Sequence, residues 1–140
     1  MRNALIMLMI VPPAVNLLIA FICWVQLRHF QHAVPVLRTS DDILRLKHLA
    51  KIMMYITLIF YALSAVPLLV WLYGIFIASV LGWWDLLLYV VLPFMIIMLV
   101  TATMDKPAKG VRATPVSDPS LQAERDYIAK VWVEQLFPDW

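Results

Sequence analysis

A long segment without charged side chains constrains the fold of this chain more than any other feature. From Ile52 to Trp84 the sequence contains no Asp, Glu, Lys or Arg, and Lys51 and Asp85 bound the segment. A helix needs about 20 predominantly apolar residues to cross the hydrocarbon core of a bilayer. Because the segment is longer than this, the sequence predicts a membrane-spanning helix.

The composition supports this prediction. The 140 residues are 64% hydrophobic and 14% charged, whereas about a quarter of the residues in a soluble domain are charged. A chain of this length cannot bury so much apolar surface in its own core, so lipid is the expected solvent. The formal net charge of +2 is too small to favour a nucleic acid as partner.

Two other apolar segments also reach spanning length. Residues 4–27 form the first, which we interpret as a retained helix because its apolar part is too long for a signal peptide. Residues 86–103 form the last. The sequence therefore predicts an all-α membrane protein with three transmembrane helices.

The second transmembrane helix is expected to be long and to begin in water. Ser40 is a good cap, and the two aspartates that follow it suit the first turn of a helix. Pro67 is expected to kink the helix, and Trp71 and Tyr73 suit the far surface of the bilayer. Residues 74–82 are also apolar, although the span is already long enough without them. This apolar excess is expected to tilt within the membrane, to lie at the outer interface or to contact a partner.

The rest of the chain divides where the composition changes. Pro107, Gly110 and Pro115 are typical of a linker, and Asp118 followed by a proline is typical of a helix start. The predicted parts are a three-helix transmembrane region at 1–104 with a cytoplasmic connection at 28–51, a flexible linker at 105–117 and a cytoplasmic tail helix at 118–140.

The tail helix is predicted to be amphipathic and to bind a partner. Its polar side chains are more acidic than basic, so an anionic leaflet repels it and a protein groove, on another subunit or on the chain's own cytoplasmic connection, is the better binding surface. The predicted partner-binding residues are Leu121, Tyr127, Ile128, Val131, Trp132, Leu136 and Phe137.

The distribution of basic residues predicts the orientation. Five of them lie in the connection 28–51 and five follow residue 105, whereas the turn near Asp85 holds none. Cytoplasmic segments carry an excess of Lys and Arg. The N-terminus is therefore expected outside and the C-terminus in the cytoplasm, with a bacterial inner membrane as the expected location.

A polar contact is predicted inside the membrane. Pro12-Pro13, Pro67 and Pro93 interrupt the three helices at a similar depth, in their outer halves. Broken helices leave carbonyl groups that need donors or a cavity. Asn16 and Ser64 are the nearest polar side chains, and we expect them to meet.

The sequence offers little support for catalysis or for a cofactor. Asp85 stands alone and is interpreted as a helix cap rather than as a catalytic carboxylate. The three histidines are expected at the cytoplasmic surface, where partly solvated side chains are favoured over a haem site at His29 and His48. No catalytic, cofactor or metal residues are therefore assigned.

The leading hypothesis is a non-enzymatic membrane protein: a small integral subunit that scaffolds or stabilises a larger membrane protein complex and docks through its C-terminal helix. It depends on the lack of a catalytic constellation and of small-residue motifs for close helix packing. One alternative is a small homo-oligomeric transporter or channel with a site at the proline-broken outer halves of the helices. A second is an accessory subunit of a haem or quinone electron-transfer complex.

Overall fold

A computed structural model describes all residues of the chain and is helical over 82% of its length, without strands. Three helices are long and apolar enough to cross a membrane, at Arg2–Ala33, Ser40–Phe76 and Trp83–Arg112. The prediction of an all-helical membrane protein with three spans is thus confirmed. The kink at Pro67 and the amphipathic, cytoplasmic character of the tail stay predictions.

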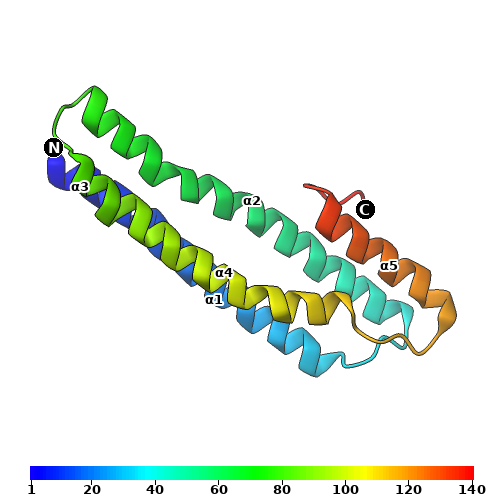
Figure 1. Ribbon diagram of the computed structural model, residues 1–140. Helices are drawn as coiled ribbons and strands as arrows, with labels where there is room; N and C mark the ends of the chain where they lie inside the picture. The colour runs from blue at the N-terminus through cyan, green and yellow to red at the C-terminus, as the bar shows by residue number, and fades with distance from the viewer. The chain divides into compact units, whose positions relative to one another are not determined.

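The elements (Figure 1) are α1 (Arg2–Ala33), α2 (Ser40–Phe76), α3 (Trp83–Leu86), the π-helical segment η1 (Leu87–Val91), α4 (Leu92–Arg112) and α5 (Pro119–Glu134).

Helix α1 is longer than the first predicted span. It contains Pro12 and Pro13 without a new start and continues to Ala33, past the predicted end at Leu27. Only residues 34–39 of the predicted connection 28–51 lie outside the helices, because α2 begins at Ser40.

The start of α2 is stabilised by reciprocal hydrogen bonds. The carboxylate of Asp42 accepts from the backbone N–H of Thr39 at 3.2 Å, and the Thr39 hydroxyl accepts from the N–H of Asp42 at 3.3 Å. This exchange is a capping box, which satisfies donors that the first turn of a helix leaves unpaired. Thr39, and not Ser40 as predicted, is therefore the capping residue, and Ser40 is the first residue of the helix.

The third span carries a local change of helix type ahead of its proline. Residues Leu87–Val91 are π-helical and lead directly into α4, whose second residue is Pro93. A proline lacks the N–H that the helix needs and its ring crowds the preceding turn. A π turn is a common way for a helix to absorb such a disturbance without ending.

The predicted linker 105–117 is wrong over most of its length, because α4 continues to Arg112. Two contacts explain why Pro107 and Gly110 do not end the helix. The side-chain amide of Gln31 donates to the carbonyl of Pro107 at 3.2 Å. A Cβ at Gly110 would lie 2.3 Å from Nε2 of Gln31, so the glycine makes room for this hydrogen bond. The connection to α5 is only residues 113–118.

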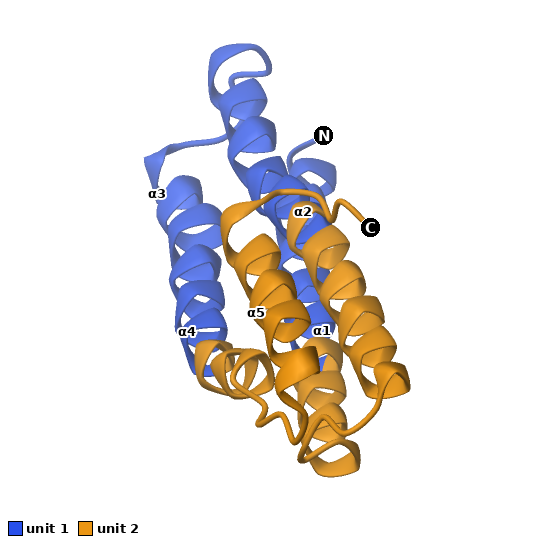
Figure 2. Cartoon of the chain, turned by 90° about the vertical axis from the view of Figure 1, so that its right-hand side faces the viewer, with its two compact units in different colours: residues 1–21, 59–103 blue, residues 22–58, 104–140 orange.

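The chain divides into two compact units (Figure 2). Unit 1 consists of residues 1–21 and 59–103, and unit 2 of residues 22–58 and 104–140. The division follows the charge, since Arg2 and Asp85 are the only charged residues of unit 1. The helical parts of unit 1 are each roughly 27–32 Å long, which matches the hydrocarbon thickness of a bilayer.

Unit 1 has an apolar cluster at the end that carries Arg2 and Asp85. Leu5 and Met9 of α1, Trp71 of α2 and Leu81 of the following turn are buried there. The indole N–H of Trp71 donates to the carbonyl of Gly82 at 3.1 Å. Packing and this hydrogen bond hold the α2–α3 turn against the end of α2.

Unit 2 has a core of its own, to which all of its helical parts contribute. Its fully buried residues include Leu27 in α1, Ile43 and Leu46 in α2, Val111 in α4 and Ile128 in α5. Both connections of the unit are joined by backbone hydrogen bonds as well. The N–H of Leu37 donates to the carbonyl of Pro115 at 2.8 Å, and its carbonyl accepts from Ser117 at 3.0 Å.

Candidate functional site

The polar contact in unit 1 joins α1 to α2. Asn16 is fully buried, and its amide nitrogen donates to the hydroxyl of Ser64 at 2.9 Å and to the carbonyl of Phe60 at 3.1 Å. The Ser64 hydroxyl donates to the same carbonyl at 2.8 Å. The structure thus brings together the two side chains that the sequence singles out, and it adds a backbone carbonyl that the sequence could not identify.

The amide oxygen of Asn16 has no hydrogen-bond partner in this arrangement. A carbonyl can only accept, so the amide nitrogen has to face Phe60 and the oxygen has to face away. That oxygen is buried and has no hydrogen-bond donor. An unsatisfied acceptor away from water costs free energy, so this position favours a donor of some kind.

Asp85 caps the third span, and Arg2 is its partner. Asp85 is 7% exposed and its carboxylate accepts from the N–H of Gly82 at 2.7 Å. Arg2 reaches the other carboxylate oxygen at 3.4 Å. The sequence indicates the cap but not the ion pair, although the topology already puts Arg2 and the turn near Asp85 on the same side of the membrane.

The α2–α3 turn accounts for part of the apolar excess at 74–82. The N–H groups of Val80 and Leu81 both donate to the carbonyl of Gly74. A Cβ at Gly74 would lie 2.2 Å from Cδ1 of Leu81, so only a glycine lets the turn fold back so closely. Leu81 is buried by this fold-back, whereas Phe76 and Ile77 stay exposed.

The predicted partner-binding residues of the tail separate into two groups. Ile128 and Val131 are buried inside unit 2 and are not free for another protein. Leu136 and Phe137 are 68% and 57% exposed. The remaining three have contacts within the unit or are partly covered by it. Leu121 and Trp132 are half-buried, and the guanidinium of Arg112 lies over the Trp132 ring. The hydroxyl of Tyr127 donates to Asp139, and its ring contacts the ring of Trp140.

Helix α5 is tied to unit 2 by polar contacts also. The ammonium group of Lys47 in α2 lies 3.1 Å from the carboxylate of Glu124, and Arg125 donates to the carbonyl of Thr114 at 3.1 Å. Asp118 caps the helix by accepting from the N–H of Ser120, and this hydrogen bond lowers the pKa of the Asp118 carboxyl. Helix α5 therefore packs against the chain's own connection 28–51, one of the two binding surfaces that the sequence left open for it.

A groove of about 420 Å³ lies beside the exposed end of the tail. Thr57 and Leu58 of α2, Arg112 of α4 and Val133 and Leu136 from the tail are among the residues that line it. Val133 and Leu136 border this groove and yet expose most of their surface. An apolar end next to a concave surface in the charged unit is a candidate docking surface.

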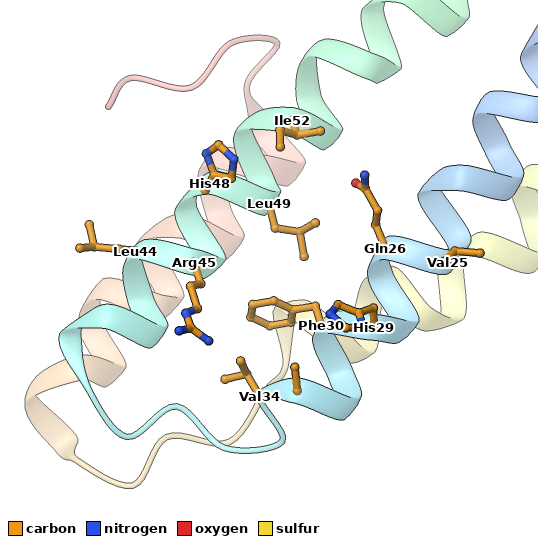
Figure 3. Close-up of a pocket in the computed structure, with 11 residues that line it drawn as sticks. Val25, Gln26, His29, Phe30, Val34, Leu44, Arg45, His48, Leu49 and Ile52 are labelled. Atoms are coloured by element: carbon orange, nitrogen blue, oxygen red, sulfur yellow. The ribbon is translucent and has the colours of Figure 1, made fainter.

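A second groove, of about 570 Å³, lies between the end of α1 and the start of α2 (Figure 3). Phe30 of α1 and Leu49 of α2 point into the space between the helices. His29, Arg45 and His48 line it as well. The two histidines that the sequence considers for haem therefore border one groove, but no group of three or more His, Cys, Asp or Glu residues is placed to hold a metal ion.

Comparison with protein-family models, with curated proteins and with solved structures finds no match to this chain.

Proposed function

We propose that this chain is a small integral membrane subunit that scaffolds or stabilises a larger membrane protein complex. One observation carries the proposal: Val133, Leu136 and Phe137 form an exposed apolar end on the unit that holds almost all the charged residues. A soluble surface rarely leaves such side chains uncovered unless they bind something. The proposed docking surface is this end of the tail with its adjoining groove, and not the whole helix.

The proposal includes a placement in the membrane. Unit 1 would lie in the bilayer, because its only charged side chains form a pair at one end. Unit 2 would begin at the inner interface of the bilayer, with its uncharged segments 22–27 and 52–58, and extend into the cytoplasm, because it holds ten of the eleven basic residues and such residues are retained there. In this arrangement residues 59–76 of α2 lie in the bilayer, and the turn that follows them folds back on the end of the helix.

The test is the variant Leu136→Lys. A lysine at this position would put an unpaired charge into the proposed interface, so we expect the amount of co-purifying partner in mild detergent to fall by about tenfold or more. Quantitative mass spectrometry of the purified complex measures this. Because Ile128 and Val131 belong to the core of unit 2, deleting the whole tail would be a poorer test.

The matched control is Ala123→Lys, which adds the same charge to an exposed position of α5. It is expected to leave the complex intact. If Leu136→Lys and wild type retain the same partners in the same amounts, the tail is not the docking surface and the proposal loses its main support.

A second candidate function has one specific observation in its favour. Asn16 follows Pro12 and Pro13 by about one turn of α1 and its amide oxygen has no donor, so a homo-oligomeric transporter or channel would have an acceptor for a polar solute there. In proteoliposomes, Asn16→Leu is then expected to abolish potassium flux while the amount of inserted protein is unchanged. Equal flux in the variant and the wild type would argue against this function.

A further inference from the structure

The groove between the end of α1 and the start of α2 has one apolar and one polar side. Val25, Phe30, Val34 and Leu49 are among its apolar residues. Gln26, His29, Arg45 and His48 supply the polar side. Every polar side chain among them can donate a hydrogen bond, and no acidic residue lines the groove. This chemistry fits a ligand with a long apolar part and an anionic head.

Arg45 is the only charged residue that lines the groove, and its present partner is replaceable. Its guanidinium lies 3.2 Å from the carboxylate of Asp41, with both side chains more than 60% exposed. Surface ion pairs of this kind contribute little to stability. A phosphate, which a guanidinium binds through two parallel hydrogen bonds, can therefore compete for Arg45 or bind beside the pair.

The groove lies where both of its helices change from apolar to charged sequence. In α1 no charged residue occurs between Arg2 and Arg28, and in α2 none follows Lys51. Val25 and Ile52 thus belong to the apolar side of this change, and Arg45 belongs to the charged side. A bilayer lipid that lies along the groove would meet apolar side chains with its acyl chain and donors with its head group.

We propose that this groove binds an anionic phospholipid of the surrounding bilayer, with an acyl chain along Val25, Leu49 and Ile52 and the phosphate at Arg45. The proposal is independent of the function as a complex subunit, because it uses none of the residues of the docking surface on the tail.

The experiment is a lipid titration of the full-length protein in detergent micelles, followed by native mass spectrometry. Dioleoyl phosphatidylglycerol is the anionic probe, and dioleoyl phosphatidylcholine, with the same acyl chains, is the zwitterionic control. We expect saturable binding of phosphatidylglycerol and clearly weaker binding of phosphatidylcholine. Equal binding of the two lipids would overturn the proposal, because it would show contact with the annular layer without recognition of the head group.

Two variants test the two ends of the groove. Arg45→Gln is expected to weaken phosphatidylglycerol binding about fivefold, which corresponds to the attraction of one basic residue for an anionic membrane. Ala33→Trp places a large ring in the groove at an exposed position and is expected to remove the saturable binding. Arg38→Gln and Ala123→Trp are the matched controls, at exposed positions away from the groove.

Competition distinguishes a lipid from a free anion. Inorganic phosphate at the concentration of the lipid is expected to leave phosphatidylglycerol bound, because it gains nothing from the apolar side of the groove. If phosphate displaces the lipid, or if Arg45→Gln and Arg38→Gln weaken binding equally, the groove is not the lipid site.

Discussion

Replacing Ile128 with alanine is expected to loosen α5 from unit 2. Ile128 is fully buried, and shortening a buried isoleucine to alanine costs about 2–4 kcal/mol through lost burial and the cavity left behind. The free energy of local opening of α5 should fall by this cost, so hydrogen–deuterium exchange of residues 119–134 should become faster by about tenfold or more. Membrane insertion should be unaffected, since unit 1 is unchanged.

Val133→Ala is the matched control in the same helix. Val133 is 64% exposed, and substitutions at exposed positions usually change stability by no more than about 0.5 kcal/mol. Its exchange should stay near that of the wild type. Equal acceleration in both variants would mean that α5 does not pack on unit 2 through Ile128.

Replacing Trp71 with alanine is expected to release the α2–α3 turn in unit 1. Trp71 is 5% exposed, contacts the ring of Trp83 at a centroid distance of 5.4 Å and donates to Gly82. Truncation of a buried aromatic residue costs about 3–5 kcal/mol. Thermal unfolding in detergent, followed by circular dichroism, should show a lower midpoint.

Two further variants separate the contributions of Trp71. Trp71→Phe keeps most of the ring and removes the hydrogen bond to Gly82, so a smaller loss of about 1 kcal/mol is expected. Trp84→Ala removes the same residue type at a position that is 77% exposed and should have little effect. A Trp84→Ala variant as unstable as Trp71→Ala would contradict the packing described for the turn.

The spans and the start of α2 could be predicted because their causes are local in sequence. Apolar length alone identifies the three membrane helices, and the reciprocal bonds between Thr39 and Asp42 connect residues three apart. The contact of Asn16 with Ser64 was predictable from a different constraint. A polar side chain in lipid needs a partner, and few are available at its depth.

The extent of the helices could not be predicted, because it depends on distant residues. Pro107 and Gly110 indicate a linker by themselves, yet α4 continues past both with Gln31 hydrogen-bonded beside it. Likewise, the sequence shows no partner for the apolar residues after Gly74, whereas in the structure Leu81 folds back onto Gly74. Local propensity is a weak prior wherever such contacts form.

The residues that line the two grooves could not be predicted from the sequence for the same reason. Which faces of α1 and α2 meet is decided by packing of the unit 2 core, and only that packing makes His29 of α1 line the same groove as Arg45 and His48 of α2. The sequence of the tail could not show that Ile128 and Val131 would be covered by the chain itself.

The pairing of Arg2 with Asp85 has a consequence for the response of the protein to voltage. A membrane potential acts on charge within the field with about 2.3 kcal/mol per elementary charge for each 100 mV. Unit 1 contains no other charged side chain, and these two lie together at one end with opposite sign. In the proposed placement, the side chains of unit 1 therefore add no net charge to the hydrocarbon core on which a change of potential could act.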